Sequence, residues 1–217
     1  MEQFLKTIID YFAALNLPTI FEFVGTFAFA ISGIRLASAK HFDWFGAYVV
    51  GAATAIGGGT LRDVMLDQPV FWMHNGIYLS CTALALLWVI IFRKSLVHMH
   101  NTFFIFDAIG LALFTIVGLQ KSLDCGMTIW VAIIMGAMTG AAGGVIRDVL
   151  INEEPLIFRK EIYAMACVLG GVVFGISDWL GAPTEITLLL CGTTVFLTRV
   201  LAVKYHICLP TLRPEED

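Results

Sequence analysis

The sequence predicts an all-α polytopic membrane protein, with seven transmembrane helices arranged as two inverted three-helix repeats plus a seventh helix. The first observation is composition: 59% of the 217 residues are hydrophobic and only 14% are charged, with a mean hydropathy of +0.85. A soluble domain averages roughly 45–50% apolar and about 25% charged residues. So few charges cannot cover a water-facing surface. The other two observations are a series of long apolar segments and an internal repeat.

The apolar segments are long enough to cross a bilayer, whose hydrocarbon core requires about 20 residues of helix. Seven segments meet this length: Pro18–Ser38, Trp44–Leu66, Asn75–Phe92, Thr102–Lys121, Met127–Ile151, Lys160–Trp179 and Pro183–Tyr205. The connections between them are short, and no polar linker divides the chain. We therefore expect one transmembrane domain over residues 1–217, with repeat 1 over about 18–92, repeat 2 over about 102–179 and the extra helix over about 183–205.

Orientation follows from lysine and arginine, which accumulate in cytoplasmic loops. With seven crossings, the connections after the first, third and fifth segments and the C-terminal tail lie on one side. That side carries most of the basic residues: Arg35, Lys40, Arg93, Lys94, Arg159, Lys160, Lys204 and Arg213. The opposite side carries only Lys6 and Lys121 outside the repeated motif. We therefore expect the N-terminus outside and the C-terminus in the cytoplasm.

The internal repeat is carried by two octets, GGGTLRDV at 57–64 and AGGVIRDV at 142–149. Their arginines are 85 positions apart (147 − 62 = 85), and the same offset aligns further pairs: Gly25 with Gly110, Phe29 with Phe114, and Ile77-Tyr78 with Ile162-Tyr163. Two glycine-rich helices can look alike by chance, but a shared motif at a fixed offset favours duplication. A unit of three crossings is odd, so the two units are expected to be inverted, which places a solute pathway near the bilayer centre.

The glycines of the octets predict an interruption in the second and fifth helices. Gly57, Gly58 and Gly59, with Gly143 and Gly144, tolerate unusual backbone angles, so a kink or unwound turn is expected. Backbone groups freed in this way must be buried in protein or face water, which suits a permeation pathway. The alternative is close packing of helices through small residues. Thr54 and Thr139 would line the pathway or bond back to their own helices.

Ionisable residues follow the glycines on the next turn and form a predicted charged vestibule. They are Arg62, Asp63, Arg147 and Asp148, and charged residues inside a membrane are functional candidates. The alternative is that the arginines reach the headgroups from near the helix ends. Glu22 and Asp107 are also 85 apart (107 − 22 = 85). The topology puts Glu22 at the level of Arg62 and Asp107 at the level of Arg147, so we expect two buried ion pairs, which lower the cost of burial.

Several functional classes are disfavoured. The five cysteines have no metal-ligand spacing, so no metal site is expected. No nucleophile with a positioned base is evident, and the chain is expected not to be an enzyme and to need no cofactor. No basic cluster suggests nucleic acid as a partner.

The doubled glycine-rich RDV motif, the three-plus-three-plus-one arrangement and the length resemble the prokaryotic branch of the trimeric intracellular cation (TRIC) channel family. The resemblance covers about Phe21 to Tyr205. It implies a homotrimer in a bacterial inner membrane, surrounded by lipids, with one pore in each subunit framed by the second and fifth helices. The implied activity is passive flow of monovalent cations, potassium or sodium, and chiefly potassium.

Two departures keep a second function open. Animal members carry a lysine-containing lipid-binding motif in the second helix, whereas this chain has Arg62 and no neighbouring lysine. Proteins of the same bacterial family are also described as glycine transporters. Inverted repeats with broken helices are equally typical of secondary carriers, and an arginine suits a carboxylate-bearing solute better than a cation. The alternative function is therefore secondary transport of a small amino acid such as glycine.

Overall fold

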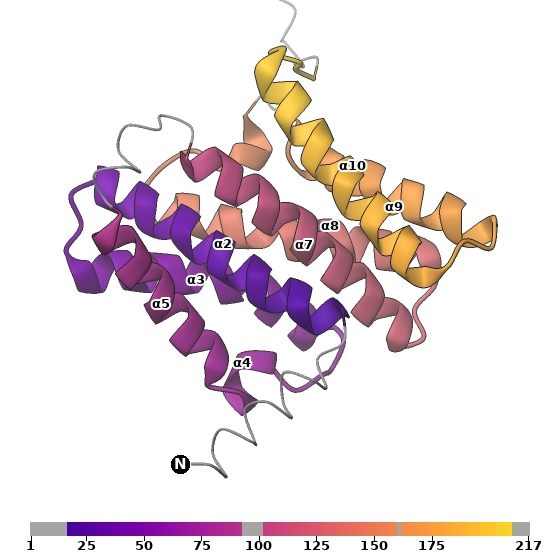
Figure 1. Ribbon diagram of the computed structural model, residues 1–217, viewed down its shortest axis with the longest axis horizontal. Coiled ribbons are helices and arrows are strands. Elements are labelled where there is room, and N and C mark those ends of the chain that lie inside the picture. The colour runs from indigo at the N-terminus through magenta and orange to yellow at the C-terminus, as the bar shows by residue number, and fades with distance from the viewer. Residues whose placement is uncertain (1–16, 93–101, 160–161, 210–217) are drawn as a thin grey trace, which may run out of the picture.

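The computed structural model describes residues 17–92, 102–159 and 162–209, and these residues fold almost entirely into α-helices (Figure 1). The predicted all-α class is confirmed. The helices are α2 (Leu17–Ala39), α3 (Trp44–Met65), α4 (Phe71–His74), α5 (Ile77–Ile91), α7 (Thr102–Asp124), α8 (Ile129–Leu150), α9 (Ala164–Trp179) and α10 (Thr184–Lys204), with a short 3-10 turn, η1, at Leu156–Phe158. Five of the basic residues used for orientation lie outside the described residues: Lys6, Arg93, Lys94, Lys160 and Arg213.

Four helices are long and apolar enough to cross a membrane, namely α2, α7, α8 and α10. Two shorter apolar helices, α5 and α9, occupy the regions where the sequence predicts full-length segments at Asn75–Phe92 and Lys160–Trp179. Helix α5 starts two residues later and ends one residue earlier than its predicted segment, while α9 starts at Ala164 and ends at the predicted Trp179. The chain first forms α4 or η1, and the 15 residues left for α5 rise only about 22 Å against a hydrocarbon core of about 30 Å.

The core is a group of four helices, α2, α3, α7 and α8, each packed on two of the others. Helix α5 covers α2 and α3 on one side, while α9 packs on α8 and α10 packs on α7 and α9 on the other (Figure 1). The buried residues of α2, α3, α7 and α8 are mostly alanine, glycine and β-branched residues. Phe29 and Phe114 are the large apolar side chains among them. Small residues let apolar helices approach closely in a bilayer, where burial from water supplies little drive for association.

The repeat seen in the sequence recurs in the helix boundaries. Both ends of α2 and α3 shift by 85 residues onto the ends of α7 and α8 (124 − 39 = 85; 150 − 65 = 85). The turns match as well: His41 and Gly126 occupy equivalent left-handed positions, with φ of 61° and 77°, and so do Asp67 and Asn152, with φ of 52° and 55°. Equivalent sequences therefore adopt equivalent helices and equivalent turns.

Contacts between the two repeats are reciprocal. The rings of Phe29 and Phe114, which are equivalent residues, stack with centroids 5.4 Å apart and planes 8° from parallel. Gly25 lies against Phe114, and Gly110 lies against Phe29. Such an exchange of equivalent partners is the mark of a two-fold axis. The residue numbers in contact fall along α7 as they rise along α2, so the two helices run antiparallel.

The glycine motifs meet at a second reciprocal contact, between α3 and α8. A Cβ on Gly58 would overlap the backbone carbonyl of Thr139, and one on Gly143 would overlap the carbonyl of Thr54. Both helices continue through their glycines without interruption. The expected unwound turn is therefore wrong, and the alternative, close packing of small residues, describes this contact. The missing side chains bring two helix backbones together instead of breaking them.

Gly143→Ala should destabilise the protein, because its new methyl group must push the α3 backbone away from α8. Overpacking of this kind costs about 1–3 kcal/mol. The check is the thermal unfolding midpoint of the purified protein in detergent. Gly175→Ala is the matched control, since its Cβ would meet Ile129 at an ordinary 3.4 Å. An equal midpoint for both variants would contradict the close contact.

Candidate functional site

Arg62 is completely buried in α3 and is held by carboxylates. Its Nε donates to Asp63 Oδ1 at 2.7 Å and its Nη2 donates to Glu22 Oε1 at 3.3 Å. Tyr78 Oη donates to the other oxygen of Glu22, Oε2, at 2.6 Å. We call Glu22, Arg62 and Asp63 the Arg62 cluster. The predicted Glu22–Arg62 ion pair is confirmed, and the alternative in which Arg62 reaches the headgroups is wrong because its side chain has no exposed surface.

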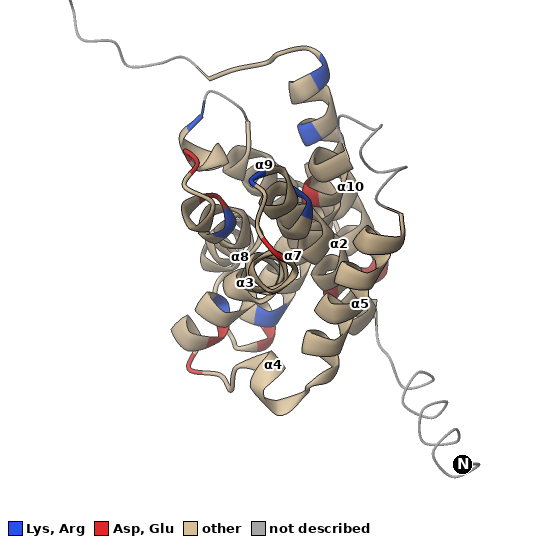
Figure 2. Cartoon of the chain, turned by 90° about the vertical axis from the view of Figure 1, so that its left-hand side faces the viewer, with Lys and Arg blue, Asp and Glu red and all other residues tan. Residues whose placement is uncertain are grey.

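Arg147 forms the equivalent cluster on α8 and is also completely buried. Its Nε donates to Asp148 Oδ1 at 2.8 Å, and its Nη1 donates to Asp107 Oδ1. We call Asp107, Arg147 and Asp148 the Arg147 cluster. The second predicted ion pair is therefore confirmed as well. In Figure 2 most of the helical surface is tan, while blue and red segments adjoin one another above and below the α3 and α8 labels.

Each aspartate of the two motifs has a second bond that ties down the connection after its helix. The Oδ2 atom of Asp63 accepts the backbone N–H of Phe71 at 3.0 Å, and that of Asp148 accepts the N–H of Leu156 at 3.0 Å. The two acceptors and the two donors are each 85 residues apart (156 − 71 = 85). Charge-assisted bonds of this kind are stronger than neutral ones. The Arg-Asp dipeptide thus joins a helix, its loop and a neighbouring helix.

Each cluster also has one partner from the opposite repeat. Lys121 on α7 donates from Nζ to Asp63 Oδ1 at 2.8 Å, and Ser32 on α2 accepts from Arg147 Nη1 at 2.9 Å. The equivalent positions are Leu36 and Val117, which have no polar side chain (121 − 85 = 36; 32 + 85 = 117). Sequence analysis missed both partners because neither is repeated. By contrast, Tyr78 and Tyr163 align at the 85-residue offset, but the sequence analysis assigned them no role.

A third buried arginine, Arg199 on α10, was also missed. Its side chain is fully buried, and Nη1 donates to the backbone carbonyl of Ile162 at 2.8 Å. Its guanidinium carbon lies 5.3 Å from the ring centre of Phe104 and 4.9 Å from that of Tyr163. The available signal was a charge inside the apolar segment 183–205, farther from its ends than Glu185 and Lys204. Arg199 attaches the seventh apolar segment to the start of α9.

The predicted permeation residues lie at the α3–α8 contact, in a closed arrangement. Thr54 and Thr139 are buried, and their hydroxyls donate to the carbonyls of Val50 and Met135 at 2.6 Å each. This is the back-bonding alternative. The other glycines also pack against side chains, Gly57 against Ile146, Gly59 against Phe71 and Gly144 against Tyr163.

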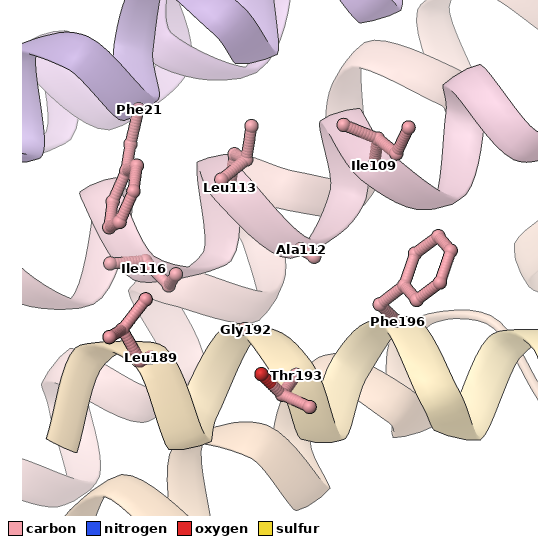
Figure 3. Close-up of a pocket in the computed structure, with 9 residues that line it drawn as sticks. All are labelled: Phe21, Ile109, Ala112, Leu113, Ile116, Leu189, Gly192, Thr193 and Phe196. Carbon is pink, nitrogen blue, oxygen red and sulfur yellow. The ribbon is translucent and has the colours of Figure 1, made fainter. Parts of the chain in front are cut away.

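An apolar groove is lined by no residue of either cluster. It has a volume of about 320 Å³ and runs between α7 and α10, with Phe21 of α2 at one end (Figure 3). Its lining is almost wholly apolar: Phe21, Ile109, Ala112, Leu113, Ile116, Leu189, Gly192, Thr193 and Phe196. A groove without charge and open to the apolar surface has no group to orient a polar solute. The chemistry of the chain is in the two buried clusters.

The family model for the glycine transporter family matches this chain twice, over residues 19–94 and 104–178. The two matches begin 85 residues apart (104 − 19 = 85), at the offset that relates the two clusters. The chain belongs to the glycine transporter family. Its members include UPF0126 inner membrane protein YadS of Escherichia coli, which is 38% identical over 199 residues, covering 90% of this chain and 96% of YadS. Family membership makes the chain a membrane protein of a channel or transporter family, and not an enzyme.

Solved structures of cation channels have the same fold as this family member. A TRIC trimeric intracellular cation channel orthologue from Rhodobacter sphaeroides superposes with a TM-score of 0.84 at 32% identity, covering 89% of this chain and all of that one. A prokaryotic TRIC channel in 0.5 M KCl gives a TM-score of 0.82 at 31% identity, with coverage of 89% and 98%. The predicted resemblance to the prokaryotic TRIC channels is confirmed.

Asp107→Ala should destabilise the protein strongly, because Arg147 would keep a buried charge with one carboxylate fewer. Loss of one partner of a buried pair costs about 3–5 kcal/mol. The measurement is chemical or thermal unfolding in detergent. The control is Lys40→Met, which removes an exposed pair with Glu153 whose side chains are 43% and 39% exposed. Exposed pairs are screened by water, so a comparable loss in the control would argue against the importance of burial.

The charge-swapped variant Glu22→Arg with Arg62→Glu should recover part of the stability that each single variant loses. The two charges would still face each other in the same buried place. Asp63 would, however, lose its bond from Arg62, and Tyr78 would lose its bond to Glu22. The readout is the coupling energy of a double-mutant cycle. No recovery in the double variant would contradict a direct interaction of Glu22 with Arg62.

Proposed function

We propose that this protein is a homotrimeric channel for monovalent cations, chiefly potassium, with one pore in each subunit framed by α3 and α8. The similarity to two prokaryotic TRIC channel structures, at 31% and 32% identity over nearly their whole length, carries the proposal. The membrane would be the bacterial inner membrane, as the name of the Escherichia coli relative says of that protein. The N-terminus would lie outside and the C-terminus in the cytoplasm.

The antiparallel packing of equivalent helices supports an inverted repeat. If α2 crosses the membrane in one direction, its equivalent α7 crosses in the other, and the axis between them lies in the membrane plane. We propose seven crossings: α2, α3 and α5 in repeat 1, α7, α8 and α9 in repeat 2, and α10 as the extra helix. The reciprocal contact of Gly58 and Gly143 is then at the bilayer centre. All 217 residues would form one transmembrane domain.

The constriction would be formed by Gly57, Gly58, Gly59, Gly143 and Gly144, with Thr54 and Thr139. The structure at this place is closed, so conduction requires α3 and α8 to separate. The two charged clusters would flank it. In the Arg62 cluster the two carboxylates are balanced by Arg62 and Lys121, and in the Arg147 cluster two carboxylates face one arginine. Neutralised arginines do not repel cations, which removes the main electrostatic objection to a cation pathway.

Secondary transport of glycine is the second candidate. The family name and the buried guanidinium groups favour it, since a guanidinium can bind a carboxylate through two parallel hydrogen bonds. Both arginines, however, already bind protein carboxylates: Arg62 binds Asp63 and Glu22, and Arg147 binds Asp148 and Asp107. A glycine carboxylate would have to displace Glu22 or Asp107 from its arginine. This competition makes the channel the better supported function.

Reconstitution into planar bilayers should give discrete unitary currents in KCl, with a reversal potential that reports cation selectivity in a salt gradient. Gly143→Ala should raise the open probability by about an order of magnitude, because its methyl group overpacks the closed α3–α8 contact and pushes the two helices apart. Gly175→Ala, on α9, is the control that should conduct like the unmodified protein. Saturable glycine uptake into proteoliposomes, without unitary currents, would overturn the channel and support the carrier.

A further inference from the structure

The two clusters differ at one point, the bond between acid and tyrosine. In the Arg62 cluster Tyr78 Oη donates directly to Glu22 Oε2 at 2.6 Å. Tyr163 is equivalent to Tyr78 and Asp107 to Glu22, but aspartate is one methylene shorter. Tyr163 Oη and Asp107 Oδ2 are both buried, and neither has a hydrogen-bond partner in the described part of the chain. The shorter acid therefore does not make the direct bond to tyrosine that the longer acid makes.

A third buried polar atom without a hydrogen-bond partner belongs to Arg147. Arg147 Nη2 is buried and has no hydrogen-bond partner among the described residues, while Nη1 of the same guanidinium holds Asp107 Oδ1. A Cβ on Gly144 would collide with Tyr163 Oη and would lie 3.6 Å from Arg147 Nη2. The hydroxyl and the guanidinium therefore lie close together beside Gly144, whose missing side chain leaves room for the hydroxyl. The three atoms are an acceptor, a donor and a hydroxyl that can be either.

Leaving these atoms unsatisfied is unfavourable, because a buried polar atom without a partner has lost its hydrogen bonds to water and gained none in the protein. A buried water molecule typically makes about three hydrogen bonds to such atoms. We propose that the Arg147 cluster binds one ordered water molecule between Asp107 Oδ2, Tyr163 Oη and Arg147 Nη2. The water donates one hydrogen to Asp107 Oδ2 and accepts hydrogens from Tyr163 Oη and Arg147 Nη2. All three atoms are then satisfied by a single ligand.

The charges around the place favour a neutral ligand over an ion. Asp107 and Asp148 both bind Arg147, and the guanidinium of Arg199 lies over the Tyr163 ring. A bound cation would face the Nη2 hydrogens of Arg147, and a bound anion would face Asp107 Oδ2. Either would also leave a net charge in an apolar bundle, which is costly. Water has both donors and acceptors and adds no charge.

The Arg62 cluster lacks the equivalent site. It has an unsatisfied atom of its own in the described residues, Arg62 Nη1. Both oxygens of Glu22 and the hydroxyl of Tyr78, however, are already used in direct bonds. A water molecule there would find one donor and no free acceptor from this acid, short of the two to four partners that hold a buried water. The site is specific to the repeat that carries aspartate.

Radiolytic hydroxyl-radical labelling of the full chain in detergent tests the site, because radicals formed from a bound water attack the side chain beside it. Tyr163 and Tyr78 form a matched pair, with exposed fractions of 1% and 5%. We expect several-fold faster labelling of Tyr163. Asp107→Glu should make the direct bond to Tyr163 and reduce Tyr163 labelling to the level of Tyr78. Glu22→Asp should remove the equivalent bond and raise Tyr78 labelling, so either variant alone keeps the test informative.

Equal, slow labelling of both tyrosines in the unmodified protein would overturn the proposal, as would Tyr163 labelling that Asp107→Glu leaves unchanged. Replacement of potassium by a large organic cation distinguishes water from an ion. Tyr163 labelling should not change on this replacement, and a change would assign the place to a cation instead. None of these readouts requires ion conduction, so the result is independent of the proposed channel activity.

Discussion

Two arginines buried in an apolar bundle impose the main constraint on this structure. A guanidinium cannot be left unpaired in hydrocarbon, so Arg62 and Arg147 each need carboxylates from their own helix and from a neighbouring one. Glu22 and Asp107 supply the second carboxylate and thereby set the register of α2 on α3 and of α7 on α8. The adjacent aspartates then anchor the following loops. Packing, register and loop position thus all follow from the cost of burying one charge per repeat.

The close approach of α3 and α8 depends on that arrangement. Reciprocal glycine-to-carbonyl contacts at Gly58 and Gly143 require both helices to be aligned to within the size of a methyl group. The ion pairs hold α3 to α2 and α8 to α7, and the Phe29–Phe114 stack holds α2 to α7. The α3–α8 contact is therefore held in place by α2 and α7, and a separation of α3 from α8 would strain the contacts that these two helices make.

The sequence alone predicted those features that occur in both halves of the chain. Helical class, the 85-residue offset and the ion pairs of Glu22 and Asp107 all follow from comparing one half with the other. Lys121 and Ser32 could not be found in this way, because their equivalents are Leu36 and Val117. Glycine was misjudged for a different reason: its missing side chain permits both an irregular backbone and a close contact, and only the facing helix decides between them. The lengths of α5 and α9 depended on loops that composition does not reveal.

Departures from the repeat make the two ends of the bundle chemically different. The Arg62 cluster is closed by direct bonds from Tyr78 and Lys121, whereas the Arg147 cluster has three buried polar atoms with no partner among the described residues, which the proposed water molecule would bridge. Both arginines are held by direct side-chain bonds, Arg62 to Asp63 and Glu22, and Arg147 to Asp148, Asp107 and Ser32. The two ends therefore differ in how the acid and the tyrosine beside each arginine are satisfied. A duplication followed by a few unpaired substitutions is sufficient to give a symmetric frame two unequal ends.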